Sequence, residues 1–218
     1  MIITIDGPAG AGKTTVSKQL ASHLGYRYLD TGALYRGVAK AAQNACVAPD
    51  DDQALEDLCA SITLEFVETS EGQRLMLDHR DITDDIRTPQ ISMLASAVSA
   101  RSVVRKFLLD TQRRIGLKKN IVVEGRDMGT VVFPDADVKF FLDAAVHTRA
   151  RRRYLELQEN DATSSDLESV ERDMMRRDNN DANRTIAPLR AAADAIVIDS
   201  TKLNVEQVIQ IMLDHITA

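Results

Sequence analysis

The chain has 218 residues, of which 44% are hydrophobic and 28% charged, and this composition is typical of a soluble globular fold. The net charge of −6 is opposite in sign to that of most general nucleic-acid-binding proteins, so no nucleic acid partner is expected. The two cysteines lie outside any CxxC pattern, and no run of about 18 apolar residues predicts a membrane span. We therefore expect a cytoplasmic protein with reduced cysteines and no membrane partner.

The first elements alternate between strand and helix. Residues 2–5 are short, apolar and β-branched, which predicts a strand. Residues 13–24 carry apolar side chains at helical spacing, and Gly25 fits the C-terminal cap of that helix. Residues 26–29 predict a second strand and residues 33–44 a second helix.

The stretch of about 60–97 breaks this alternation. Three short strands without an intervening helix are expected there, and they predict a small antiparallel unit inserted in the α/β core. The strands are expected at residues 62–66, 74–78 and 80–82, with turns at 70–72 and 78–79. A helix over residues 89–97 would lead back into the core.

The second half of the chain returns to strands between helices, which favours a parallel sheet covered on both faces. Strands are expected at residues 121–123, 138–142 and 195–198. Helices are expected at residues 99–115, 146–159, 166–177 and 205–216. Asn204 with Gln207 three residues later predicts a capping box for the last helix.

A phosphate-binding loop pattern, GxxxxGK[ST], lies directly after the first strand and opens a helix. Its residues are Gly7, Pro8, Ala9, Gly10, Ala11, Gly12, Lys13 and Thr14. Glycines let backbone N–H groups approach phosphate oxygens, and a helix N-terminus favours an anion. Lys13 is expected between the β- and γ-phosphates of ATP, Thr14 at Mg²⁺ and Thr15 at the α-phosphate. The alternative, a chance glycine turn, leaves the flanking strand and amphipathic helix unexplained.

The loop alone does not separate kinases from GTPase switches or motor ATPases. A regulatory GTPase needs an Asn-Lys-x-Asp tetrad, which the sequence lacks. A mechanical ATPase needs a strand of four apolar residues closing in Asp or Asp-Glu. Residues 121–127, Ile-Val-Val-Glu-Gly-Arg-Asp, do not match, although their acidic end occupies a similar place. The small size and the insertion favour a small-molecule kinase.

Arginines follow two of the predicted strands, and an acceptor that is itself a phosphate needs several of them. After the second strand, Thr31 can cap a helix or bind a ligand, Arg36 lies one turn further, and Asp30 could order a water on Mg²⁺. In the run 124–130, Arg126 lies where open α/β sheets place ligands, and Asp127 could bind a base or orient Arg126. The alternatives are a solvated arginine at an ordinary helix start and a structural ion pair.

Two later segments carry further charge. Arg177, Asp181 and Arg184 recur at helical spacing and are predicted to share one helix face. Arg149 and Arg153 also share a face and could close over a triphosphate as part of a lid. The alternatives are a solvated charged face and a solvated basic helix.

These residues together resemble the bacterial cytidylate kinases, which belong to the P-loop nucleoside monophosphate kinases. The matching segments are 3–14 (ITIDGPAGAGKT), 29–36 (LDTGALYR), 85–88 (DIRT), 125–136 (GRDMGTVVFPDA), 177–184, 187–189 (APL) and 193–195 (ADA). They run from end to end, so the resemblance covers essentially the whole chain, and GRDMGT is particularly specific. Two positions depart from the family pattern, Thr14 and Thr31, and both keep a hydroxyl group.

The resemblance implies an α/β fold with a P-loop NTPase-type parallel sheet of five strands flanked by helices, and a three-stranded antiparallel insertion. It implies a single kinase domain over residues 1–218. The core would comprise residues 1–59 and 98–218, the inserted nucleoside monophosphate-binding unit about 60–97, and a mobile lid about 149–184.

The resemblance also implies transfer of the γ-phosphate of ATP to CMP or dCMP, with Mg²⁺, giving ADP and CDP or dCDP. The residues that bind CMP would be Thr31, Arg36, Arg87, Ser96, Arg105, Arg126, Asp127, Asp181 and Arg184. Among them, Ser96, Arg105 and Asp127 would read the cytosine, and Asp181 and Arg184 would hold the pentose. The catalytic residues would be Lys13, Arg126, Arg184, Arg149 and Arg153, with Arg152 as a further lid arginine.

We expect direct in-line transfer without a covalent intermediate, because the acceptor phosphate is a dianion near neutral pH and needs no general base. The four histidines are accordingly expected to be peripheral, and the protein is expected to be a monomer. Two alternatives stay open. A kinase for shikimate or a sugar acid would use fewer acceptor arginines, and a non-catalytic nucleotide switch would show no acceptor-dependent turnover.

Overall fold

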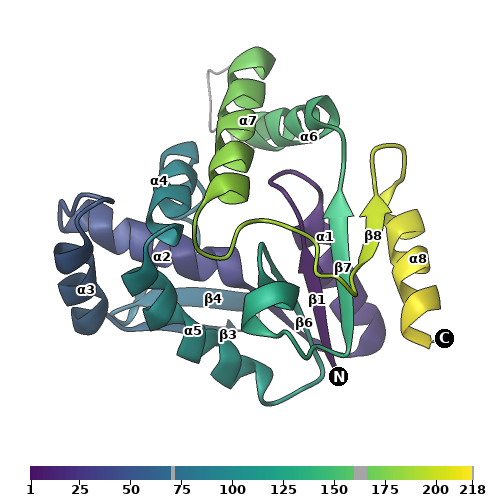
Figure 1. Cartoon of the computed structure of the whole chain (residues 1–218), viewed down its shortest axis with the longest axis horizontal. Coiled ribbons are helices and arrows are strands. Elements are labelled where there is room, and N and C mark those ends of the chain that lie inside the picture. The colour runs from purple at the N-terminus through teal and green to yellow at the C-terminus, as the bar shows by residue number, and fades with distance from the viewer. Residues whose placement is uncertain (70–71, 160–165, 218) are drawn as a thin grey trace. The chain divides into compact units, whose positions relative to one another are not determined.

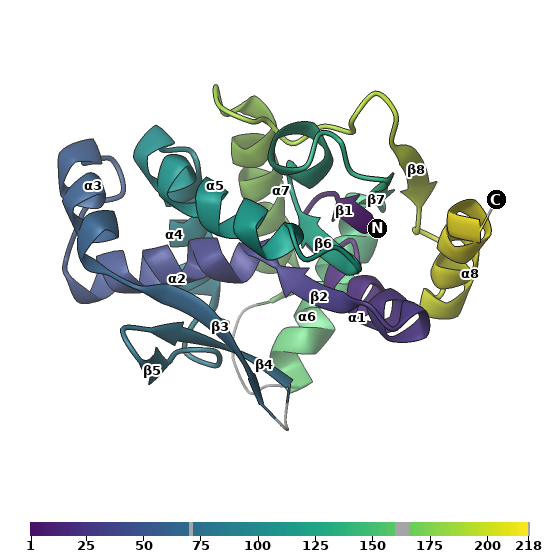
Figure 2. The same ribbon diagram turned by 90° about the horizontal axis from the view of Figure 1, so that it is seen from below.

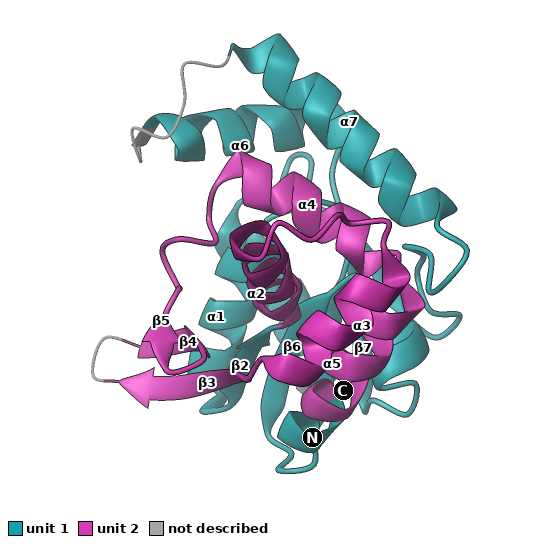
Figure 3. Cartoon of the chain, turned by 90° about the vertical axis from the view of Figure 1, so that its left-hand side faces the viewer, with its two compact units in different colours: residues 1–30, 113–218 teal, residues 31–112 magenta. Residues whose placement is uncertain are grey.

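The computed structural model describes residues 1–69, 72–159 and 166–217. The chain divides into two compact units, one made of Met1–Asp30 with Arg113–Ala218 and the other of Thr31–Gln112 (Figure 3). Each unit has a hydrophobic core of its own. The three strands predicted within residues 60–97 lie inside the second unit, whose limits are wider because the helices on either side share its core.

The first unit is built on a parallel sheet of five strands in the order β2-β6-β1-β7-β8. Strands β1, β7 and β8 lie side by side in Figure 1. Its elements are β1 (Ile2–Asp6), α1 (Lys13–Leu24), β2 (Arg27–Asp30), β6 (Ile121–Gly125), the π-helical turn η1 (Met128–Val132), β7 (Val138–Asp143), α6 (Val146–Glu159), α7 (Leu167–Asn183), β8 (Ile196–Asp199) and α8 (Val205–Thr217). The predicted five-stranded parallel sheet is confirmed.

The side chains of the central strand β1 pack on both faces of the sheet. Ile3 and Ile5 are fully buried in a core to which α1 and α8 also contribute. These two helices lie side by side in Figure 2. Because side chains alternate along a strand, Thr4 faces the other side, where its hydroxyl lies close to Gly129 of η1. The register pairs Asp6 with Gly125 and Asp30 with Glu124. The carboxyl ends of β1, β2 and β6 therefore meet at one edge of the sheet.

Local sequence signals set the ends of two helices in this unit. Gly25 has a φ of 65°, and its backbone N–H caps α1 on the carbonyls of Ala21 and Ser22. At the start of α8, the side chain of Asn204 accepts from the N–H of Gln207 at 2.9 Å, and the side chain of Gln207 accepts from the N–H of Asn204 at 3.0 Å. Both predicted caps are confirmed.

The second unit holds the antiparallel sheet, in the order β3-β4-β5. Its elements are α2 (Thr31–Asn44), α3 (Asp52–Ser61), β3 (Leu64–Thr69), β4 (Gly72–Leu77), β5 (Arg80–Asp81), α4 (Pro89–Ser99) and most of α5 (Ser102–Gly116). Asp78 and His79 join β4 to β5 with φ angles of 47° and 68°, which confirms the predicted turn. Of the other predicted turn, Ser70 and Glu71 lie outside the described residues.

Two helices differ from their predicted bounds by more than two residues. The helix expected over residues 99–115 begins later, because Ala100 caps α4 and Arg101 is drawn out of helical geometry. Its Nε donates to Asp52 of α3 at 2.7 Å. The helix expected over residues 166–177 extends to Asn183.

Helix α3 was not predicted. The side chain of Asp51 accepts from the N–H of Ala54 at 3.0 Å and so caps its first turn. Leu55 and Cys59 lie one turn apart and are buried in the core of the second unit. Their spacing is a signal that could have indicated this helix.

Two expectations from composition can be compared with the fold. Cys46 and Cys59 are both free thiols. Within the described ranges, no helix combines the length and the apolar character that crossing a membrane requires.

Candidate active site

The phosphate-binding loop connects β1 to α1 and depends on glycine. Gly7, Gly10 and Gly12 have φ angles of 148°, 72° and 92°, which residues with a Cβ rarely adopt. A Cβ on Gly7 would lie 2.0 Å from the carbonyl oxygen of Leu142 in β7. The backbone of the loop therefore packs closely against β7. The N–H groups of the loop at the N-terminus of α1 are suited to bind an anion.

Lys13 is the cation of this loop. Its Nζ donates to the carbonyl of Pro8 at 2.6 Å, and the residue is only 7% exposed. Burial, and then the nearby Arg126, lower the pKa of Lys13 to about 7. An anion beside Lys13 would relieve both effects, which suits the site to a phosphate.

Hard oxygen groups gather beside Lys13 at the ends of β2 and β6. The buried carboxylate of Glu124 accepts from the hydroxyls of Tyr28 and Thr14. Burial, and then the charge of Asp30, raise the pKa of Glu124. No group of three or more His, Cys, Asp or Glu side chains in the described part of the chain could hold a metal ion alone. Thr14 and these carboxylates fit Mg²⁺, which keeps waters and nucleotide phosphates among its ligands.

Hydrogen bonds to Asp6, the last residue of β1, connect this strand to the segment after β6. Its carboxylate accepts from the backbone N–H groups of Met128 at 2.9 Å and Gly129 at 2.8 Å. Burial raises the pKa of Asp6 to about 6, although the two N–H groups act in the opposite direction. The phosphate loop follows Asp6 directly in the chain, and the Arg126–Asp127 pair directly precedes Met128. The contact therefore brings these two segments close together. The sequence interpretation gave Asp6 no role, because its spacing to other residues carried no signal.

The Arg126–Asp127 loop is joined to the end of α7 by two ion pairs. Arg126 Nε lies 2.9 Å from Asp181 Oδ2, and Arg184 Nη2 lies 3.3 Å from Asp127 Oδ1. The side chains of Asp181, Asp127 and Arg184 are all 4% exposed or less. Burial raises the pKa of Asp181, but Arg126 and other arginines outweigh it and hold that pKa below its usual range. The four predicted residues are thus brought together.

The predicted helix face is corrected in two respects. Arg184 follows the helix, with an extended backbone (φ −63°, ψ 141°), and its Nε donates to the carbonyl of Ala187 at 2.6 Å. It therefore does not share the helix face of Arg177 and Asp181. The alternative of a solvated charged face is wrong for Asp181 and Arg184, whose side chains are buried.

The arginines of α6 take different positions. Arg149 is buried, and its guanidinium donates to the carbonyls of Ala144 at 2.7 Å and Ala9 at 3.0 Å and to Asp178 at 2.5 Å. Arg152 donates to the carbonyl of Ser200 at 2.8 Å. Arg153 pairs with Glu156 at 2.9 Å near the surface. Only Arg149 of the predicted lid arginines touches the phosphate loop, and a solvated basic helix does not describe it.

In the second unit, Arg105 contacts α4, the helix that carries Ser96. The guanidinium carbon of Arg105 lies 5.7 Å from the centre of the Tyr35 ring, and Nη1 donates to the carbonyl of Ser99 at 3.3 Å. Ser99 Oγ in turn donates to the carbonyl of Ser96 at 2.9 Å. Ser96 and Arg105 are both buried.

The other residues of this unit that were predicted to bind the acceptor lie on α2 and just before α4. Thr31 is the buried first residue of α2, and Arg36 lies further along the same helix, partly buried. Arg87 is exposed, just before α4. The four histidines, His23, His79, His147 and His215, are all exposed.

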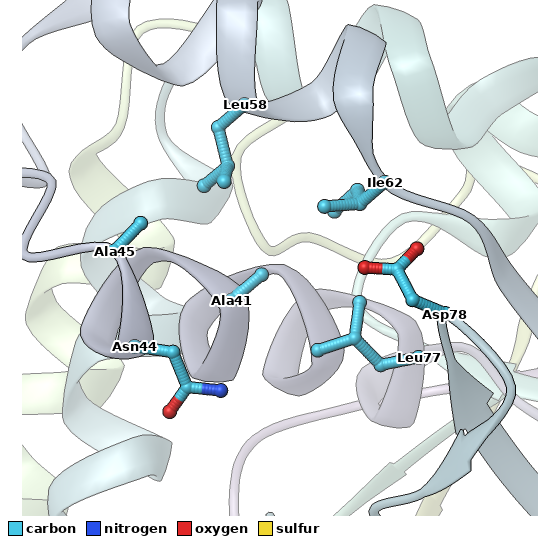
Figure 4. A pocket seen from close by; sticks show the side chains of 7 residues that line it. All are labelled: Ala41, Asn44, Ala45, Leu58, Ile62, Leu77 and Asp78. Carbon is cyan, nitrogen blue, oxygen red and sulfur yellow. The ribbon is translucent and has the colours of Figure 1, made fainter.

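A shallow pocket of about 250 Å³ also lies in the second unit (Figure 4). Its lining residues are Ala41, Asn44, Ala45, Leu58, Ile62, Leu77 and Asp78. None of them is a predicted site residue, and the lining is mostly apolar. The pocket therefore does not belong to the candidate active site.

The fold and the loop define a P-loop protein of the nucleotide-binding α/β class. A solved shikimate kinase from Bacteroides thetaiotaomicron has this fold, with a TM-score of 0.51 and 11% identity over 100% of this chain and 99% of that chain. The family model for cytidylate kinase matches residues 3–218. A cytidylate kinase of Geobacter sulfurreducens is 51% identical over 97% of this chain and 91% of its own length. One of Carboxydothermus hydrogenoformans is 45% identical over 99% and 97%.

The chain belongs to the cytidylate kinase family, and it is a kinase, a nucleotide-binding phosphotransferase. The resemblance found in the sequence is confirmed.

Proposed function

We propose that the protein transfers the γ-phosphate of ATP to CMP or dCMP, with Mg²⁺, and releases ADP and CDP or dCDP. The observation that carries the proposal is the contact of Asp6 with the N–H groups of Met128 and Gly129. This contact connects two segments next to each other in the fold. The phosphate loop is suited to bind the phosphate donor, and Arg126 is suited to bind the phosphate of the acceptor. Membership of the cytidylate kinase family supports CMP as the acceptor.

The donor half comprises residues 7–15. The N–H groups of the loop bind the β- and γ-phosphates, Lys13 places its ammonium between them, and Thr15 binds the α-phosphate. Mg²⁺ would be held by Thr14 and, through a water, by Asp30, and when bound it supplies neutralisation of phosphate charge. The hydroxyls of Tyr28 and Thr14 both donate to Glu124. The carboxylate of Glu124 therefore orients the Thr14 hydroxyl.

The acceptor half comprises the residues that the family resemblance assigns to CMP. Arg126 and Arg36 bind the acceptor phosphate, with Arg87 or Arg105 assisting. The cytosine is read by Ser96, Arg105 and Asp127, and the pentose is held by Asp181 and Arg184. The buried pairs of Arg126 with Asp181 and of Arg184 with Asp127 orient these side chains before the substrate binds.

The reaction needs no nucleophilic side chain. An oxygen of the acceptor phosphate attacks the γ-phosphorus, and the bond from that phosphorus to the β–γ bridging oxygen breaks, so ADP leaves with the electron pair. Catalysis consists of positioning and of charge neutralisation by Lys13, Arg126, Arg184, Arg149 and Arg153. The segment of about 149–184 would act as a lid, and the protein would act as a cytoplasmic monomer.

Arg126→Ala tests the acceptor half. Its turnover of CMP should fall by about 100-fold or more, because the group that neutralises charge in the transition state is lost. The dissociation constant for ATP should stay nearly unchanged. Arg176→Ala is the matched control, since Arg176 lies on α7 with a side chain that is 62% exposed. Unchanged steady-state kinetics in Arg126→Ala would overturn the assignment.

A further inference from the structure

Helix α7 presents two aspartates on one face, and one pairs with an arginine of α6 while the other pairs with an arginine of the loop after β6. Asp178 and Asp181 are three residues apart, so they are neighbours on the helix surface. Asp178 pairs with Arg149 of α6 at 2.5 Å, and Asp181 pairs with Arg126 after β6 at 2.9 Å. All of these residues belong to the first unit.

Arg149 connects Asp178 to the phosphate loop. Its Nη1 donates both to Asp178 and to the carbonyl of Ala9 at 3.0 Å, and its Nε donates to the carbonyl of Ala144 at 2.7 Å. The guanidinium is therefore fixed on three sides by acceptors.

Direct packing adds to this connection. A Cβ on Gly10 would lie 2.7 Å from the Cε of Met174 in α7 and 2.9 Å from the carbonyl oxygen of Arg149. Ala9 packs against a small apolar core of α6 and α7 that contains Met174, Val170 and Leu157. The phosphate loop therefore cannot shift at Ala9 and Gly10 without moving α7 or losing these contacts.

At its other end, the same face of α7 meets the acceptor loop. The side chain of Asp181 is only 4% exposed, and Arg126 is its partner. The carbonyl of Asp181 also accepts from the N–H of Leu189 at 2.8 Å, which fixes the chain that follows the helix. Asp178, whose partner Arg149 donates to the phosphate loop, and Asp181, whose partner is Arg126, lie less than one helical turn apart on α7.

We propose that α7 couples donor and acceptor binding, and that Asp178 is the positioning residue through which it does so. The inference rests on the proposed function, because it takes ATP as the ligand of the phosphate loop and CMP as that of Arg126. CMP that engages Arg126 and Asp181 fixes α7. The fixed helix holds Arg149 on the carbonyl of Ala9, and the phosphate loop is then already ordered for ATP.

Linkage makes the coupling measurable from both sides. If CMP raises the affinity for ATP by a given factor, ATP must raise the affinity for CMP by the same factor. We expect a factor of about five or more in the wild type, the lower end of usual coupling between sites. A residue with only a structural role would change the amount of folded protein and leave this ratio unchanged.

The experiment is titration calorimetry of the full chain with CMP and a non-hydrolysable ATP analogue, each alone and each in the presence of the other. Asp178→Asn removes the charge that holds Arg149 and should bring the coupling factor to about one. Asp178→Glu restores the charge and should recover part of the coupling. Asp173→Asn is the matched control, since Asp173 lies on α7 with a side chain that is 52% exposed. It should keep the wild-type factor.

Three outcomes overturn the inference. In the first, both ligands bind and CMP is phosphorylated, but the wild-type factor is one. In the second, Asp178→Asn keeps the wild-type factor. In the third, CMP neither binds nor is phosphorylated, and the proposed function fails with the inference. If Asp178→Asn does not fold, Arg149→Met removes the same contact from the other partner and should abolish the coupling.

Discussion

Replacing Gly7 with alanine should disrupt the phosphate loop more than any other conservative change in it. The added Cβ would lie 2.0 Å from the carbonyl oxygen of Leu142, whereas real Cβ contacts are essentially never under 3.0 Å. The oxygen belongs to the backbone of β7, so no side chain can rotate away. The φ of 148° at Gly7 adds conformational strain.

The magnitude follows from these contacts. Opening the approach from 2.0 Å to at least 3.0 Å displaces the loop or β7 by about 1 Å. A misplacement of about 1 Å in a site of this kind costs about 100-fold in activity. Overpacking of this type costs about 1–3 kcal/mol of stability, and the positive φ adds about 1 kcal/mol. Gly7→Ala should therefore lose about 100-fold in kcat/KM and about 2–4 kcal/mol in the free energy of unfolding.

Gly25→Ala is the control that separates the effect of backbone strain from the effect of a steric clash. Gly25 also has a positive φ, 65°, but a Cβ there would meet nothing within 4 Å. It should lose only about 1 kcal/mol and keep its activity. Urea denaturation and steady-state kinetics on both variants provide the test. Equal losses of stability, or a Gly7→Ala variant with wild-type kcat/KM, would refute the reasoning.

Three further predictions concern Lys13 and Asn204. Since burial and Arg126 lower the pKa of Lys13 to about 7, ATP binding at about pH 8 should take up about one proton. Calorimetry in buffers of different ionisation enthalpy measures this, and a buffer-independent enthalpy would contradict it. The unfolded chain keeps the Lys13 proton up to the ordinary pKa of 10.5, so this lysine should make stability rise as pH increases above about 7. Lys13→Met should remove that slope in urea denaturation. Asn204→Ala breaks the capping box of α8 and should lower the free energy of unfolding by about 1 kcal/mol, again by urea denaturation.

The parts of the fold that depend on local sequence could be predicted. The phosphate loop is specified by glycines whose backbone angles no other residue adopts easily, and Gly25 and Asn204 mark helix ends by their own hydrogen bonds. Helix α3 carried a local signal as well, in the spacing of Leu55 and Cys59. The boundary between α4 and α5 depended instead on a contact of Arg101 with a distant helix.

The contacts that assemble the site could not be read from spacing. Asp6 meets Met128 and Gly129, and Arg149 meets Asp178, through pairings of elements far apart in the chain. The arginine-rich segments were recognisable by composition and resemblance. Which of their charges are buried was decided by partners on other elements, as for Arg149 and Asp178.

An acceptor panel tests the central claim most directly. Release of ADP from ATP would be followed by a coupled assay with CMP, dCMP, UMP, AMP and shikimate, each as the single acceptor. The account predicts turnover with CMP and dCMP at the highest kcat/KM of the five, and a loss of that turnover in Arg126→Ala. Shikimate turnover above that of CMP, or nucleotide binding with no acceptor-dependent ADP release, would contradict it.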